Sequence, residues 1–285
     1  MNNMEKLIHT KITGNFVYPE IKDTDFVFGS GEVIGTVLND SGDWRNYLPP
    51  HEFQNKNGVE SSACFIEAQQ HTIATILEKQ YSIHDSNFSS RFNLIFSDAT
   101  PLGGSPLKGA QTIRDHGVIP DEMLPFADYI QSWQEFNSFE GGNKGACIVT
   151  GQIWLQKWEP KYDIVFLKND SVETKYRKLR EALKFSPVCA SVYAWVEDPV
   201  SGFYVKPDGY NDQHLVEIIH VDENNSVYVL DTYEPFIKRL NPNFNFDFGM
   251  RWSLFVKDTA PAQKKYWFTD IFIKLSKLIK QIIWK

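Results

Sequence analysis

"SSACFIEAQQ", residues 61–70, places a cysteine where a helix is expected to begin. The residues that follow carry apolar side chains near one helical face, with no internal glycine or proline: Phe65, Ile66, Ile73, Ile76 and Leu77. This pattern predicts a helix over residues 63–79 with Cys64 in its first turn. A helix N-terminus stabilises a thiolate, and a neighbouring imidazolium stabilises it further. Cys64 is therefore a candidate nucleophile, although a lone cysteine on such a helix is more often a buried packing residue.

The composition is that of a globular protein. Of 285 residues, 42% are hydrophobic and 23% are charged. Cys64, Cys147 and Cys189 are too few and too widely spaced for a disulfide framework or a Cys-x-x-Cys half-site, so we expect a reducing compartment. Histidines and carboxylates do not cluster at metal-ligand spacing and no phosphate-binding glycine motif is complete, so we expect no metal and no cofactor. The net charge of −7 argues against nucleic acid as a partner.

The two halves of the chain differ in their patterns. Helical spacing dominates the first half. After Pro187, short runs rich in β-branched and aromatic residues alternate with turn residues, and these runs are "VCASVYAW", "HLVEIIHV", "SVYVLDTY" and "MRWSLFV". Helices followed by antiparallel-looking strands predict an α+β fold with two lobes and a cleft between them.

A thiol nucleophile needs a histidine, and the strand pattern favours His214. His71 is seven residues along the same helix as Cys64, roughly 10 Å of axial rise away. His220 lies on the same strand as His214 but roughly 20 Å farther along it, so at most one of the two can serve. His214 opens its strand beside a loop, where side chains meet a cleft.

Two further groups complete the expected chemistry. Asp231 ends the strand "SVYVL", which is expected to pair with the His214 strand, and its carboxylate would accept the far imidazole N–H and fix the ring. A tetrahedral intermediate needs hydrogen-bond donors for its oxyanion. The candidates are the backbone N–H of Cys64 and the side-chain amide of Gln54.

In their order these residues resemble the papain-like cysteine peptidases. Mature chains of that family begin near Asp-Trp-Arg, continue to a Gln and reach a Cys followed by an aromatic residue, as in "GDWRNYLPPHEFQ" and "SSACF". The Gly-rich stretch and following helix of the family resemble "PLGGSPLKGAQTIRDHGVIPDEMLPF", its Gly-Pro-Val strand resembles "SPVCASVYAW", and its His strand resembles "DQHLVEIIHVD". Its Asn-Ser-Trp-Gly turn falls on "DTYE". Cys64 and His214 are 150 residues apart, within the family's range of about 130–150.

The resemblance covers about residues 43–256 and implies a papain-like two-lobe fold. A helical left lobe would span about 43–126, and an antiparallel β-barrel-like right lobe about 127–257. Residues 1–42 would form an N-terminal extension, too short for the usual helical inhibitory prosegment. Residues 258–285 would form a linker and a basic amphipathic tail helix.

The resemblance also implies an activity and a set of residues. Peptide bonds would be hydrolysed through a thioester acyl-enzyme formed on the cysteine, and the catalytic residues would be Cys64, His214, Asp231 and Gln54. Substrate would be bound by Gly103, Gly104, Gln213 and Tyr233, with the two glycines hydrogen-bonding an extended peptide. The chain differs from the family in having Asp231 for the usual Asn, and Phe65 and Tyr233 for two tryptophans.

The C-terminal segment "WFTDIFIKLSKLIKQIIWK", residues 267–285, combines a broad apolar face with lysines mostly opposite. Its expected partner is its own domain, another protein in an assembly, or an anionic membrane surface. We find neither a secretory signal nor the roughly 18–20 apolar residues of a membrane span. We therefore expect a prokaryotic or phage protein that is cytoplasmic or virion-associated.

Two other functions fit the sequence. The first is a catalytically silent papain-like fold that serves as a binding or structural module, for example in a phage particle, docked through the tail helix. The second is a cell-wall endopeptidase of the CHAP type, which also uses Cys and His, although those domains are shorter and have less sequence between the two residues.

Overall fold

The computed structural model describes residues 17–21, 27–28, 35–193, 195–206 and 213–257. The chain divides into two compact units, residues 1–255 and 256–285, and only the first two residues of the second unit are described. The tail helix expected at 267–285 therefore lies outside the described residues. Most of the expected N-terminal extension does too.

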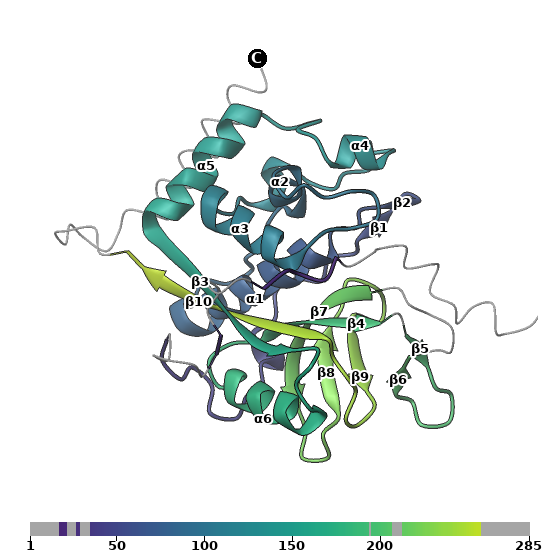
Figure 1. The fold of residues 1–285 in the computed structure, drawn as a ribbon. Helices are drawn as coiled ribbons and strands as arrows, with labels where there is room; N and C mark the ends of the chain where they lie inside the picture. Colours follow the sequence, from purple (N-terminus) through teal and green to yellow (C-terminus); the bar gives the residue numbers. More distant parts are fainter. Residues whose placement is uncertain (1–16, 22–26, 29–34, 194, 207–212, 258–285) are drawn as a thin grey trace, which may run out of the picture. The chain divides into compact units, whose positions relative to one another are not determined.

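The first half of the described chain is mainly helical, as the sequence predicts. After the 3₁₀ turn η1 (Arg45–Tyr47) and a small hairpin of β1 (Asn55–Lys56) and β2 (Val59–Glu60), the helices follow (Figure 1). They are α1 (Cys64–Tyr81), α2 (Ser90–Ile95), α3 (Pro106–His116), α4 (Trp133–Phe136) and α5 (Lys144–Lys157), with the 3₁₀ turn η2 (Asp121–Met123) after α3. One more helix, α6 (Val172–Ala182), lies among the strands of the second half. The helix predicted over residues 63–79 is α1, which begins at Cys64.

The second half forms most of one sheet. Its strands are β3 (Trp158–Leu167), β4 (Val188–Tyr193), β5 (Val196–Glu197), β6 (Tyr204–Val205), β7 (Gln213–Val221), β8 (Val227–Leu230), β9 (Ile237–Leu240) and β10 (Phe248–Val256). They lie in the order β3-β10-β4-β7-β8-β9-β6-β5. The pairing is antiparallel from β10 to β9, while β6 pairs with β9 in parallel.

The right side of the fold was expected to be barrel-like, and the sheet is not a closed barrel. β3 and β5 are the two ends of the strand order, and no pairing joins them among the described residues. β5 and β6 have two residues each, so the β5 end of the sheet offers few backbone groups for pairing with another strand. The α+β class is as predicted.

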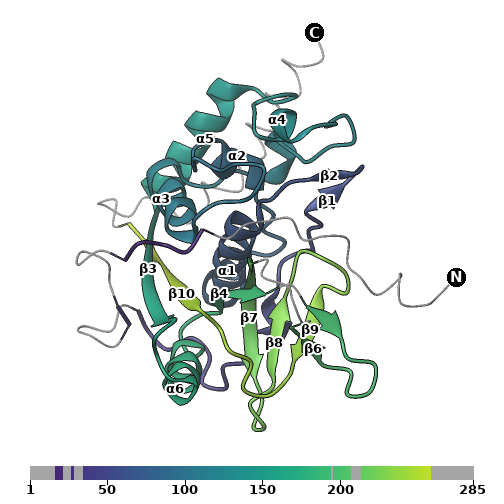
Figure 2. The same cartoon turned by 45° about the vertical axis from the view of Figure 1, so that its right-hand side comes forward.

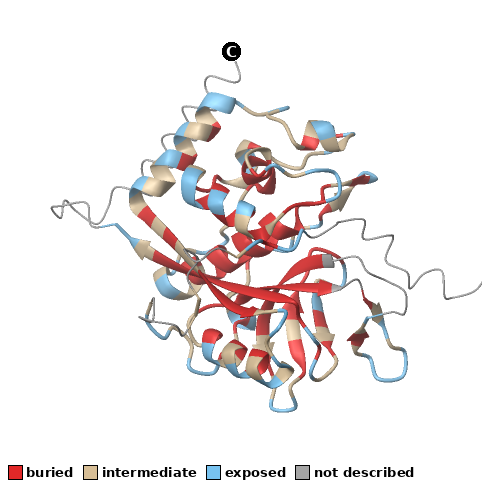
Figure 3. Ribbon diagram, viewed as in Figure 1, coloured by how far each residue is buried: buried red, intermediate tan, exposed pale blue. Residues whose placement is uncertain are grey.

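Helix α1 is the central element that positions the site. Every residue from Cys64 to Leu77 is buried. One side of α1 packs on β4 and β7 and the other on α2 and α3, so the helix lies between the sheet and these two helices (Figure 1, Figure 2). The burial continues into the adjoining strands (Figure 3). Because α1 is enclosed on both sides, its first residue is held at a fixed place beside the sheet.

The other face of the sheet has its own apolar cluster, to which α6 contributes. Successive residues of β4 point to opposite faces, as in any strand. Cys189 therefore belongs to the cluster around α1, and Val188 and Ala190 belong to the cluster that includes Leu179 of α6.

A membrane-spanning helix is absent from the described part of the chain. No helix there combines the length and hydropathy that crossing a bilayer requires.

Candidate active site

Cys64 is the first residue of α1 and is 5% exposed. The turn before it is fixed by hydrogen bonds: the Ser62 hydroxyl donates to the Pro101 carbonyl at 2.7 Å, and the Ala63 N–H donates to the Ser61 hydroxyl at 3.2 Å. Ser62 has a φ of 55°, which this tight approach to the helix requires. At the helix start, the N–H of Cys64 has no intrahelical acceptor, so it is available as a donor.

His214 and Asp231 form a buried pair on neighbouring strands. His214 lies near the start of β7, and Asp231 directly follows β8, which pairs with β7. His214 Nε2 lies 2.7 Å from Asp231 Oδ1, and both side chains are fully buried. The other ring nitrogen, Nδ1, has no hydrogen-bond partner among the described residues. The pairing of the two strands is as the sequence predicts.

The pKa of the His214 ring depends on the charges of its neighbours, and Cys64 is one of these neighbours. Burial lowers the pKa of His214, but the negative charges of Cys64 and Asp231, together with the hydrogen bond to Asp231, outweigh burial and raise this pKa to about 10. Burial raises the pKa of Asp231, and the cations His214 and Lys238 reverse this, so that pKa lies well below its ordinary value. The geometry therefore favours a negative Asp231 beside a protonated imidazole.

Lys238, which the sequence patterns did not single out, contacts the second oxygen of the same carboxylate. Its Nζ lies 2.8 Å from Asp231 Oδ2, and both side chains are fully buried. Lys238 lies on β9, in register with Val229 of β8. A lysine within a short strand carries no motif, so only the folded structure connects it to Asp231.

Gln54 lies at the site, but its side-chain amide is engaged by other groups. Its Nε2 donates to Glu60 Oε1 at 2.6 Å and to the Tyr233 hydroxyl at 2.7 Å, while its Oε1 accepts from the Thr232 hydroxyl at 2.6 Å. Both hydrogens of the amide thus have acceptors. To donate to an oxyanion, Gln54 would have to exchange one of these bonds.

Tyr233 and Glu60 complete this network. The Tyr233 hydroxyl donates to Glu60 Oε2 at 2.5 Å, and Glu60 Oε1 also accepts from the Ser62 N–H at 3.1 Å. Burial, followed by the negative charge of Glu60, raises the pKa of Tyr233 far above its ordinary value, so its hydroxyl keeps its proton. Glu60 therefore connects the turn before Cys64 with the turn after Asp231. Glu60 belongs to none of the sequence motifs.

The two glycines expected to bind substrate lie next to the helix that carries Cys64. Gly104 packs so closely on the Phe65 ring that a Cβ there would lie 2.5 Å from the ring. Gly103 has a φ of 101°, and the Gly104 carbonyl accepts from the Val17 N–H at 3.4 Å. Gln213 begins β7, and its side chain lies outside the described part of the structure. Substrate binding by these residues stays a prediction.

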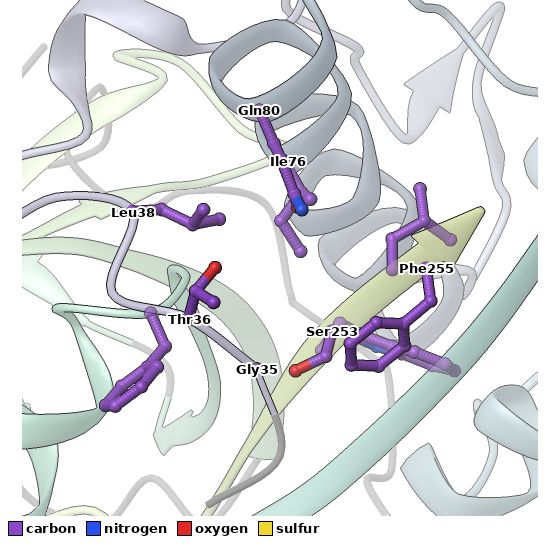
Figure 4. Close-up of a pocket in the computed structure, with 10 residues that line it drawn as sticks. Gly35, Thr36, Leu38, Ile76, Gln80, Ser253 and Phe255 are labelled. Atoms are coloured by element: carbon purple, nitrogen blue, oxygen red, sulfur yellow. The ribbon is translucent and has the colours of Figure 1, made fainter.

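A separate small pocket lies near the other end of α1 (Figure 4). Its lining residues are Gly35, Thr36, Leu38, Ile76, Gln80, Phe185, Trp252, Ser253, Leu254 and Phe255. Ile76 is twelve residues along α1 from Cys64, or roughly 18 Å of helix. This mainly apolar pocket therefore does not belong to the Cys64–His214 site. Among the described residues, no cluster of His, Cys, Asp and Glu is arranged to hold a metal ion.

Comparisons by sequence give no relative: no family model and no curated protein matches the chain. Comparison with solved structures does. Xylellain, a cysteine protease from Xylella fastidiosa, matches with a TM-score of 0.60 and 13% identity over 87% of this chain and 97% of that one. ProCathepsin B S9 from Trypanosoma congolense matches with a TM-score of 0.60 and 14% identity over 86% of this chain and 87% of that one.

A third solved structure, digestive procathepsin L 3 of Tenebrio molitor larval midgut, matches with a TM-score of 0.53 and 13% identity. It covers 80% of this chain and 73% of that one. At these identities the likeness concerns the fold, and it agrees with the resemblance found in the sequence motifs. The chain has the fold of the papain-like cysteine proteases.

Proposed function

We propose that this protein is a cysteine peptidase that hydrolyses peptide bonds with Cys64 as its nucleophile. The observation that supports the proposal most strongly is the buried His214 ring. One nitrogen contacts Asp231, the other has no partner among the described residues, and the charge of Cys64 acts on the same ring. A thiol, an imidazole and a carboxylate in this order provide a nucleophile, a proton carrier and a group that orients the carrier.

The chemistry follows from these three groups. The Cys64 thiolate adds to the substrate carbonyl, and the protonated His214 gives its proton to the leaving amine as the C–N bond breaks. A thioester remains on Cys64. His214, now neutral, takes a proton from water, which attacks the thioester and releases the carboxylic acid product. Asp231 holds the ring throughout and stabilises its protonated form.

The oxyanion that forms at each addition needs donors. The N–H of Cys64 at the start of α1 is one candidate, and the positive end of the helix adds to it. Gln54 is the second candidate, on condition that the substrate oxygen displaces Glu60 or Tyr233 from its amide. An extended substrate at Gly104 would likewise compete with Val17 for the Gly104 carbonyl.

Labelling with iodoacetamide at pH 6, followed by peptide mapping, tests the nucleophile. We expect Cys64 to react more than about tenfold faster than Cys147, Cys189 and the cysteine of an unfolded peptide of residues 61–70. His214→Ala should remove this advantage. His220→Ala, on the same strand, is the matched control and should keep it. Equal rates for Cys64 and the unfolded peptide would refute the proposal.

Hydrolysis itself needs a second measurement. The protein is incubated with a mixture of denatured proteins, and new peptide termini are counted by mass spectrometry, with Cys64→Ser as the control. We expect new termini only with the intact cysteine. Rapid labelling of Cys64 without any cleavage would contradict the peptidase and would favour a binding module instead.

A further inference from the structure

Both oxygens of the Asp231 carboxylate are held in the folded protein. Oδ1 lies 2.7 Å from His214 Nε2 and accepts the Thr232 N–H at 2.6 Å. Oδ2 lies 2.8 Å from Lys238 Nζ. The histidine and the lysine thus contact one carboxylate through different oxygens, and all three side chains are fully buried.

The ammonium group of Lys238 is also fixed independently of Asp231. Its Nζ donates to the Tyr233 carbonyl at 2.5 Å and to the Pro235 carbonyl at 2.8 Å. With Asp231, these acceptors match the three hydrogens of an ammonium group. The rings of Trp195 and Tyr204 lie with their centroids 6.0 and 5.5 Å from Nζ, which favours a cation there. Burial lowers the pKa of Lys238 and the Asp231 carboxylate acts in the opposite direction, so these acceptors and rings favour the ammonium form against the cost of burial.

A buried carboxylate beside a thiolate and an imidazolium would leave one uncompensated negative charge, which is costly away from water. We propose that Lys238 is a positioning residue of the peptidase site, which cancels the charge of Asp231 so that the pair offers His214 a hydrogen-bond acceptor without net charge. This inference rests on the proposed function. It also explains why this chain can have aspartate where the family it resembles has asparagine, because Asp231 with Lys238 and a lone asparagine carry the same net charge.

Other titratable groups act on His214 or Asp231 and must be considered in any pH measurement. They are Cys64, Glu67 and His71 of α1, Tyr204 of β6, and Tyr233 in the turn after β8. The thiolate of Cys64 has the largest charge effect on the ring, so its contribution has to be removed before that of Lys238 can be measured.

The test is the titration of the His214 ring, followed by NMR in a Cys64→Ser background. Adding Lys238→Met to that background removes a positive charge that opposes the protonation of His214. The pKa of His214 should therefore rise by at least about one unit. Lys175→Met is the matched control. Lys175 is equally buried and bound to the Lys168 and Phe246 carbonyls, but it does not contact the site. It should leave the titration of His214 unchanged.

A second measurement covers the case in which Lys238→Met fails to fold. Asp231→Asn leaves a buried lysine without its anion, whereas Asp231→Asn combined with Lys238→Met leaves no buried charge. We expect the double variant to melt at a higher temperature than Asp231→Asn alone.

The labelling rate of Cys64 at pH 6 should also recover in the double variant. Two outcomes would overturn the inference: a His214 titration that Lys238→Met does not shift, or a double variant whose losses are the sum of the single losses. Slow labelling of the wild-type Cys64 would instead refute the proposed function, since the ring titration is measured in a Cys64→Ser background and does not use the nucleophile.

Discussion

Replacing Arg91 by methionine should loosen the segment that supports the turn before Cys64. Arg91 belongs to α2 and is completely buried. Its guanidinium donates to five backbone carbonyls between residues 125 and 140, at distances from 2.7 to 3.0 Å. The same segment contains Trp133, whose indole N–H donates to the Ser61 carbonyl at 3.0 Å. Arg91 thus acts on the approach to Cys64 through one intermediate side chain.

The size of the effect follows from where the five bonds lie. The bond to the Phe136 carbonyl is fully buried, and the other four are partly buried. A buried carbonyl that loses its donor costs about 1–3 kcal/mol, and each bond that water can replace contributes about 0.5 kcal/mol. Arg91→Met should therefore lower the free energy of unfolding by about 3–5 kcal/mol, which corresponds to a fall in melting temperature of about 10 °C.

Two measurements check this prediction. Thermal unfolding gives the stability, and hydrogen exchange gives the protection of amides in residues 125–143, which should fall more than that of β7. Arg114→Met is the control, because Arg114 is exposed on α3 and its loss should change stability by less than about 0.5 kcal/mol. The prediction is wrong if Arg91→Met melts within about 2 °C of the wild type, or if the amides of residues 125–143 are as well protected from exchange as in the wild type.

Three further predictions concern single positions. Gly104→Ala would push a Cβ into the Phe65 ring and should cost about 1–3 kcal/mol in thermal unfolding, whereas Gly145→Ala, where the nearest atom is 3.5 Å away, should cost much less. Tyr233→Phe removes two hydrogen bonds, one of them to a carboxylate, and should lower the free energy of unfolding by about 2–4 kcal/mol; a variant as stable as the wild type would contradict the network described here. Burial raises the pKa of Glu217 from 4.5 to about 7, so the folded state holds this proton more tightly and stability is lost as the pH rises between these values. Relative to Glu217→Gln, the wild type should lose roughly 3 kcal/mol over that range in urea unfolding, and parallel pH curves would show that Glu217 is not the cause.

The sequence predicts those parts of the fold that depend on local patterns. Helix α1 follows from apolar spacing, and its start at Cys64 lies within one residue of the expected start. The pairing of the strands that carry His214 and Asp231 follows from their short β-branched runs and the turn between them.

The remaining features depend on contacts between distant residues. Lys238 breaks the expectation that lysines of a strand face water, and its burial is explained by the second Asp231 oxygen together with the Tyr233 and Pro235 carbonyls. The orientation of the Gln54 amide is set by Glu60, six residues away, and by Tyr233, 179 residues away. Neither neighbour belongs to a recognisable motif. The open sheet was likewise not predictable, because strand order at the β5 edge depends on the parallel contact between β6 and β9.

The contacts of Gln54 with Thr232 have a consequence for how the protein tolerates change. The Gln54 N–H donates to the Thr232 carbonyl at 3.2 Å, and the Thr232 hydroxyl donates back to the Gln54 amide oxygen. Thr232 directly follows Asp231, so the segment leading to the nucleophile and the turn behind the imidazole share one residue pair. Changes at Gln54 and Thr232 are therefore coupled. A substitution at Thr232 would alter the segment that leads to Cys64 without contacting Cys64 itself, and a compensating change would be expected at Gln54.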